Sequence, residues 1–269
     1  MAGAVIPGLL DDLSAEHDSL ASLLSGRPDR DWAAPTPAPV WTVRDQIAHL
    51  AHFDGITALC VGEPEKFVSL RDSLADLQAY VDGIGAGHAG RSGPDMLDWW
   101  AAEQRGLRAA AEAADPGARV PWFGPSMSLA SKLTARLMET WAHGQDVADA
   151  LGARREPTAR LRHVARIGVL AFANSYRARG LPVPGAAVRV DLTPPDGGEH
   201  WTWGDPVSPD VVSGPAEDFC LVVTQRRHPA DTALRISGAV AREWTSIAQA
   251  FAGPPGAGRR PGQFAARAR

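Results

Sequence analysis

The chain has 269 residues, of which 45% are hydrophobic and 22% charged, a composition typical of a soluble globular protein with one large domain or two modest ones. Its net charge of −4 and isoelectric point near 6.1 argue against binding to nucleic acid or to a membrane surface. No run approaches the ~20 apolar residues that cross a bilayer, and the N-terminus lacks a secretory signal, so we expect a cytoplasmic protein. Cys60 and Cys220 lie far apart in apolar patterns and are expected to be reduced core thiols.

The first 180 residues have the apolar spacing of amphipathic helices. In chain order, helices are predicted over residues 6–24, 42–60, 70–81, 92–115, 126–152 and 157–177. His17 falls on the apolar stripe of the first helix, which favours a packed core histidine over a metal ligand. Thr42 and Asp45 form a capping-box pattern at the start of the second. That helix is apolar on nearly all faces, which predicts a place in the middle of a bundle.

The fifth helix carries the pattern that points to chemistry. Glu139 and His143 are four residues apart, so one face of the helix can offer a carboxylate oxygen and an imidazole nitrogen to the same metal ion. Such pairs also occur on solvated faces, but this one is surrounded by apolar residues, and buried carboxylates and imidazoles need partners. Asp146 follows three residues after His143 and is expected to orient the His143 imidazole without itself binding the metal.

A third metal ligand must come from another helix. The second helix offers His49 and His52 in the run IAHLAHFD, and the spacing leaves both open. Two histidines and a glutamate with a free fourth position have the layout of a catalytic zinc site. A protein side chain in the fourth position, such as His52, would instead indicate a structural or storage role.

Residues 121–128, PWFGPSMS, hold an aromatic pair between prolines just before the fifth helix. The pair forms either an aromatic wall over a pocket or a hydrophobic plug at the end of the bundle, and the sequence favours neither. In the first case Trp122 would contact the substrate.

After Gly180 the periodicity changes to that of a small α+β domain. Strands are predicted over residues 186–195, 200–204 and 234–237, and helices over residues 215–225 and 239–251. Residues 253–269 are rich in proline, glycine and arginine and are expected to be a disordered tail. The chain is thus predicted to be mainly α, with a helical bundle over residues 1–180, a small α+β domain over 181–252 and a tail over 253–269.

The runs WTVRDQIAHLAHFD (residues 41–54) and ARLMETWAHGQDVADALG (residues 135–152) resemble the DinB-like metal-binding superfamily, in particular the N-terminal domain of mycothiol-dependent maleylpyruvate isomerase. The resemblance implies an up-down bundle in which His49, Glu139 and His143 hold a divalent metal and His52 is a pocket or packing residue. Residues 212–244 look like the small domain that follows the bundle in these isomerases, whose functional arginine would fall on Arg226. The whole chain also resembles an actinobacterial group of metal-binding proteins with a C-terminal domain labelled for wyosine-base formation, although no residues here suggest an iron–sulfur or tRNA site.

The chemistry that this resemblance implies is a thiol-dependent transferase or isomerase reaction on a small electrophile. Zn²⁺, or another divalent ion such as Ni²⁺ or Fe²⁺, would hold mycothiol or a similar thiol as its thiolate. Arg226 would bind a substrate carboxylate or enolate; its alternative role is to satisfy carbonyls at a helix end. Arg136 joins Trp122 and His52 in the substrate-binding set, and it alternatively orients Glu139 or pairs with a surface acid.

Two other functions fit the same residues. One is a hydrolase in which the metal activates water. The other is a non-catalytic protein that binds a metal or a small molecule. The expected partners are a small-molecule substrate and a low-molecular-weight thiol, with neither nucleic acid nor membrane, and a homodimer is the oligomer to test for.

Overall fold

The protein is seen in a computed structural model that describes residues 2–264. The chain forms two compact units, Met1–Arg155 and Glu156–Arg269. The sequence predicted the boundary between the two parts near residue 180, which lies after the observed boundary at Arg155. The difference arises because the helix over Leu161–Leu170, expected in the bundle, packs against a helix of the second unit.

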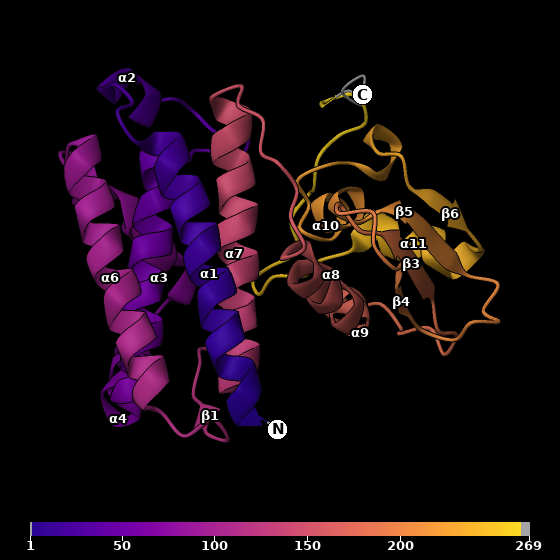
Figure 1. Cartoon of the computed structure of the whole chain (residues 1–269), viewed down its shortest axis with the longest axis horizontal. Coiled ribbons are helices and arrows are strands. Elements are labelled where there is room, and N and C mark those ends of the chain that lie inside the picture. The colour runs from indigo at the N-terminus through magenta and orange to yellow at the C-terminus, as the bar shows by residue number, and fades with distance from the viewer. Residues whose placement is uncertain (1, 265–269) are drawn as a thin grey trace. The chain divides into compact units, whose positions relative to one another are not determined.

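Long helices lie side by side in the first unit (Figure 1): α1 (Ala2–Leu24), α3 (Val43–Gly62), α6 (Gly93–Ala113) and α7 (Leu129–Ala150). Helix α3 packs against both α6 and α7, and α1 also packs against both of them. The core between these helices includes the buried side chains of Leu20, Ile47, Trp100 and Leu133. Helix α3 therefore has the central place that its apolar faces predicted.

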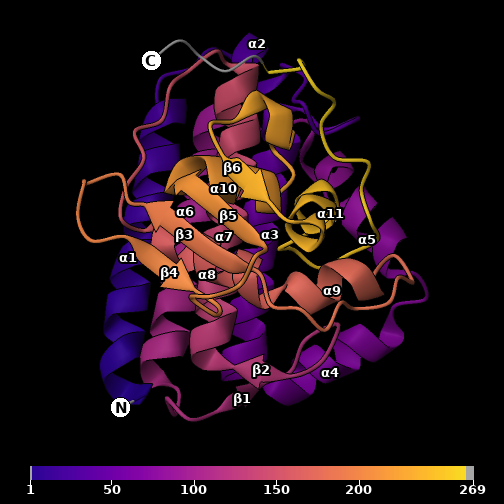
Figure 2. The ribbon, with the colours of Figure 1, turned by 90° about the vertical axis from the view of Figure 1, so that its right-hand side faces the viewer.

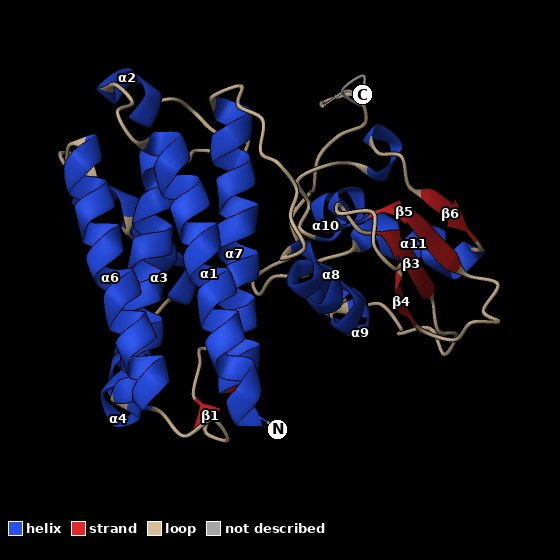
Figure 3. Cartoon of the chain, viewed as in Figure 1, coloured by secondary structure: helices blue, strands red, loops and turns tan. Residues whose placement is uncertain are grey.

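Shorter elements connect the long helices (Figure 3): α2 (Asp29–Trp32), α4 (Pro64–Ser73), α5 (Leu77–Gly83), the 3₁₀ helix η1 (Gly85–His88), and the strands β1 (Arg119–Val120) and β2 (Met127–Ser128). The sequence predicted one helix over residues 70–81, but two are present. Asp76 starts the second of them, because its side chain accepts hydrogen bonds from the backbone N–H groups of Gln78 and Ala79. Strands β1 and β2 form an antiparallel hairpin that the sequence pattern did not predict.

The second unit combines a sheet with helices (Figure 2). Its strands are β3 (Arg189–Thr193), β4 (Trp201–Trp203), β5 (Val211–Pro215) and β6 (Arg235–Ser237), in the order β4-β3-β5-β6. Its helices are α8 (Leu161–Leu170), α9 (Phe172–Arg177), α10 (Ala216–Val223), η2 (Pro229–Asp231) and α11 (Ala239–Ile247). Strand β3 pairs in parallel with β5 and antiparallel with β4, and β5 pairs antiparallel with β6. The expected mainly α fold with a small α+β part is confirmed.

Some details of the second unit differ from the expectation. Strand β5 was not predicted. The single helix predicted over residues 157–177 is divided at Ala171, because α8 packs against α10 and α9 packs against α11. Residues 253–264 of the expected disordered tail contain neither helix nor strand, although the Gly262 N–H donates to Asp231 Oδ1 at 2.7 Å; residues 265–269 lie outside the described residues. Within residues 2–264, no helix is long and apolar enough to cross a membrane.

Candidate metal centre

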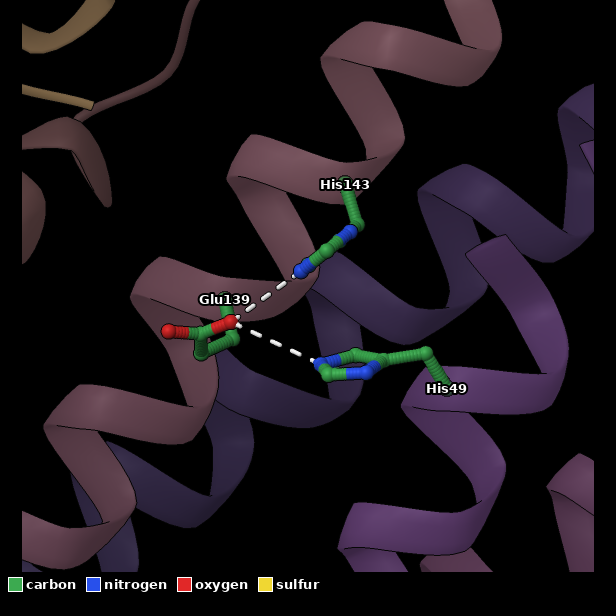
Figure 4. A group of neighbouring side chains, drawn as sticks. All are labelled: His49, Glu139 and His143. Atoms are coloured by element: carbon green, nitrogen blue, oxygen red, sulfur yellow. Dashed lines mark hydrogen bonds and ion pairs between the residues drawn. The ribbon is translucent and has the colours of Figure 1, made fainter. Parts of the chain in front are cut away.

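His49, Glu139 and His143 meet between α3 and α7 (Figure 4). Nε2 of His143 lies 3.1 Å from Oε2 of Glu139, and Nε2 of His49 lies 3.8 Å from the same oxygen. The three ligand atoms lie within 4.8 Å of one another. Zinc–ligand bonds of about 2.1 Å place the ligand atoms of a tetrahedral site roughly 3.4 Å apart, so small side-chain movements would close these residues around an ion. In the described part of the chain, this is the group of His, Cys, Asp and Glu side chains whose geometry suits a metal.

The start of α3 is set by the capping box that the sequence predicted. The Thr42 N–H donates to Asp45 Oδ2 at 2.8 Å, and the Asp45 N–H donates to the Thr42 hydroxyl oxygen at 3.3 Å. These bonds satisfy N–H groups that have no partner within the helix. His49 lies about two turns further along α3, where its imidazole faces the α7 ligands (Figure 4).

Gln46, one turn before His49, orients the other imidazole. Its Oε1 lies 2.5 Å from Nδ1 of His143. Because an amide oxygen can only accept, Nδ1 of His143 donates to it, and Nε2 is the ring nitrogen that faces Glu139. The sequence pattern pointed to Asp146 as the residue that orients this imidazole and gave no signal for Gln46. Asp146 is fully buried on α7, but the Nδ1 partner comes from α3.

The electrostatics of the group favour the protonation states that metal binding needs. Burial, together with the nearby His143, lowers the pKa of His49 to about 3, which keeps its imidazole neutral. Burial raises the pKa of Glu139, but the imidazoles of His143 and His49 outweigh burial and hold that pKa well below its usual range. At neutral pH the group therefore offers a carboxylate and the neutral imidazole of His49, as a divalent cation requires.

Trp41, which the sequence pattern did not single out, covers the two imidazoles. Its ring is stacked on His143 at a centroid distance of 5.7 Å and tilted on His49 at 5.1 Å. Trp41 and His49 both line a pocket of about 260 Å³, whose other lining residues are Val40, Asp45 and residues 81, 82 and 84–86. A small molecule can therefore approach a predicted metal ligand from this pocket.

His52 points away from the group and toward α5. Its Nε2 lies 2.6 Å from the hydroxyl of Tyr80, and its ring packs edge-on against Phe53. Of the two histidines left open by spacing, the structure therefore brings His49 to Glu139 and His143. Burial lowers the pKa of His52.

Trp122 lies in an aromatic cluster rather than on the pocket described above. It stacks on the buried Phe67 at a centroid distance of 5.9 Å and contacts Phe53 at 6.0 Å. The amino group of Lys132 lies over its ring, 2.7 Å from the centroid. Burial and the neighbouring Arg136 lower the pKa of Lys132 to about 6. The tryptophan that lines the pocket beside His49 is therefore Trp41 and not Trp122.

Arg136, one of the expected substrate-binding residues, pairs with a buried acid and not with the surface acid that was one alternative. Its Nε donates to Asp54 Oδ1 at 3.0 Å and its Nη2 donates to the Leu50 carbonyl at 3.2 Å. Trp100 Nε1 donates to Asp54 Oδ2 at 2.9 Å. His17, packed in the core as expected, has its Nε2 3.3 Å from the same oxygen. Burial raises the pKa of Asp54, but Arg136 and His17 outweigh it and lower that pKa to about 2. This buried polar network joins side chains from all four long helices.

Arg226 follows α10 in the second unit. Its Nη1 donates to the carbonyl of Thr224, the C-cap residue of that helix, at 2.7 Å. This is the contact that the helix-end interpretation predicts.

Comparison with known proteins gives matches in sequence and in structure. Two uncharacterised proteins from two strains of Mycobacterium tuberculosis are each 43% identical over 249 residues, covering 92% of this chain and 96% of theirs. The crystal structures of mycothiol-dependent maleylpyruvate isomerase and of a histidine-to-alanine mutant of it share the fold, with TM-scores of 0.56 and 0.55. Both are 16% identical in sequence and cover 82% of this chain and 90% of theirs. Residues 13–148 match the family described as mycothiol maleylpyruvate isomerase N-terminal domain, and the chain belongs to that family.

Proposed function

We propose that this protein is a metal-dependent enzyme that uses a low-molecular-weight thiol, such as mycothiol, in a transferase or isomerase reaction on a small electrophilic substrate. The observation that carries the proposal is the His49–Glu139–His143 group, one of whose imidazoles lines a pocket. Membership of a family named for a mycothiol-dependent isomerase gives the thiol as the cosubstrate to test first.

His49, Glu139 and His143 would hold Zn²⁺, or another divalent ion such as Ni²⁺ or Fe²⁺. Two imidazoles and a carboxylate are a donor set that suits these ions and leaves a position for a further ligand. A bound ion would keep a thiol ionised at neutral pH, the form that attacks carbon electrophiles.

The residues of the chain prepare this chemistry in three ways. Glu139 supplies negative charge that binds a cation, because its pKa is held low. Gln46 holds the ring of His143 in one tautomer and one orientation. Trp41 covers the two imidazoles, so that substrate and thiol would approach through the pocket beside it. Arg226 is proposed, from the family resemblance alone, to bind a carboxylate of the substrate.

Metal content tests the first half of the proposal. The purified protein should contain about one divalent ion per chain by elemental analysis, and His49→Ala should reduce this to background. His52→Ala is the matched control, since His52 lies one turn away on the same helix and contacts Tyr80 instead. Full occupancy in His49→Ala would remove His49 from the ligand set.

Thiol binding tests the second half. In the cobalt-substituted protein, a thiol that binds the metal should add a sulfur-to-metal charge-transfer band, and the metal-free protein should not bind that thiol. Arg226→Ala should keep this band, because Arg226 is proposed to hold the electrophile. If no thiol changes the cobalt spectrum at millimolar concentration, the transferase and isomerase proposals fail together, and the hydrolase or the non-catalytic binder becomes the leading function.

A further inference from the structure

The second unit contains a pocket of about 280 Å³ whose charged lining is entirely basic. Arg179, Arg227, Arg259 and Arg260 line it together with His228, and no aspartate or glutamate is among its described lining residues. Arginine presents a planar fork of N–H donors that matches the oxygens of a phosphate or carboxylate group. The residues that line this pocket thus suit an anion.

The chain closes this pocket with its own C-terminal segment, residues 253–264. The carbonyl of Gly253 accepts a hydrogen bond from Gln249 Nε2 at 3.1 Å, and the carbonyl of Gly256 accepts one from Arg179 Nη2 at 3.4 Å. The guanidinium of Arg227 lies 4.1 Å from the centre of the Phe264 ring. These contacts, with the Gly262 bond to η2, hold the arginines of the segment on the wall of the pocket.

Two residues of the pocket wall, Gln225 and His228, have defined local contacts, and one of them leaves a donor for a ligand. Gln225 has a φ of 60° because it is the residue after the C-cap of α10, where the helix ends: its N–H donates to the carbonyl of Val222 at 3.0 Å, and the N–H of Arg226 donates to that of Leu221 at 2.7 Å. Gly256 approaches it so closely that an added Cβ would lie 2.8 Å from Gln225 Oε1. At His228, Nδ1 accepts the N–H of Ala230 at 3.1 Å, so the ring proton lies on Nε2, which can donate to an anion.

We propose that this pocket is a binding site for a small anionic metabolite or ion that carries a phosphate or carboxylate group. The volume lies near the lower limit of small-molecule pockets, which suits a compact ligand. The site lies wholly within the second unit and is separate from the metal group, so it goes beyond the proposed function. Arg226, the arginine suggested by the family resemblance, is not among its lining residues.

Isothermal titration calorimetry with inorganic phosphate, and separately with malonate, tests the site at constant ionic strength set by chloride. Arg260→Gln should weaken binding by about tenfold or more, as expected for the loss of a charge-assisted hydrogen bond. Arg260 is exposed, so its substitution should leave the fold unchanged. Arg235→Gln is the matched control, because Arg235 is an exposed arginine on β6 of the same unit and does not line the pocket. A preference for phosphate or for malonate identifies the source of the anionic group, and either result supports the site.

Three results would overturn the proposal. The first is that neither anion binds at about 10 mM. The second is that Arg260→Gln and Arg235→Gln weaken binding equally, which would mean unspecific attraction to a positive surface. The third is that binding disappears when the metal is removed, because the anion would then be a ligand of the ion. Unchanged binding in the metal-free protein supports the pocket even if the thiol experiment fails.

Discussion

Gln46 on α3 and His143 on α7 are joined by a hydrogen bond of 2.5 Å between Oε1 and Nδ1. The same glutamine donates from Nε2 to the hydroxyl of Thr36 at 2.9 Å, and that hydroxyl donates to the carbonyl of Trp41 at 2.8 Å. The segment that carries Trp41 is therefore connected through Gln46 to a predicted metal ligand. Gln46, which orients the His143 imidazole, and Trp41, whose ring covers both imidazoles, therefore belong to one hydrogen-bonded chain.

Gln46→Ala should weaken metal binding by about 10–100-fold, because the His143 ring loses the partner that sets its tautomer and orientation. The dissociation constant can be measured by competition with a chromogenic chelator. Gln104→Ala, on α6 away from the metal group, should bind the metal like the wild type. An unchanged constant in Gln46→Ala would show that the hydrogen bond does not support the site.

Trp41 should report metal binding by fluorescence. Co²⁺ or Ni²⁺ bound by His49 and His143 would lie close to the indole ring stacked on them and should quench its emission. The quenching on metal addition should fall in Trp41→Phe and should be unchanged in Trp203→Phe, a substitution in β4 of the second unit. Trp41→Ala should also release the metal to a chelator more rapidly, since it uncovers the imidazoles. Equal quenching in the wild type and Trp41→Phe would place the ion elsewhere.

Lys132 should make the stability of the protein depend on pH. Its side chain is 2% exposed, and burial lowers its pKa from 10.5 to about 6. Between these two values the unfolded chain binds a proton that the native chain does not, so the free energy of unfolding rises with pH across this window and falls as the pH is lowered. The contribution is at most about 1.4 kcal/mol per pH unit.

Urea unfolding at about pH 6.5 and about pH 9 checks this dependence. Lys132→Met should unfold with a smaller increase in stability between the two pH values than the wild type. Lys66→Met, which removes an exposed lysine paired with Glu63, should keep the wild-type increase. If Lys132→Met kept it too, the amine would be charged in the native protein.

The first unit should fold by itself. A chain shortened to end at Thr158 retains Arg155, whose Nη1 donates to the Trp141 carbonyl at 2.8 Å and whose guanidinium pairs with the buried Glu16. It should show a helical circular dichroism spectrum and bind the metal like the full chain. In the shortened chain, Arg155→Ala should lower stability by roughly 3 kcal/mol, because it removes the guanidinium that pairs with a buried carboxylate. Loss of helix in the chain ending at Thr158 would mean that the first unit needs the second.

The sequence by itself was sufficient for features that depend on local spacing. The i,i+4 relation of Glu139 and His143, and the capping box of Thr42, follow from helix geometry alone. The apolar faces of residues 42–60 placed that helix in the core, where the structure has α3. The same reasoning gave the mainly α fold and the change to an α+β part after the long helices.

Only the tertiary structure decided which residues meet across helices and strands. His49 rather than His52 faces the α7 ligands, and Gln46 contacts His143, because of how α3 is rotated against α7, which no spacing along one helix reveals. The pairing of Arg136 with Asp54, 82 residues apart, has the same origin. Strand β5 depends on parallel pairing with β3, whose hydrogen bonds join segments distant in the sequence. Helix α8 belongs to the second unit because it packs against α10, a contact that its own periodicity does not specify.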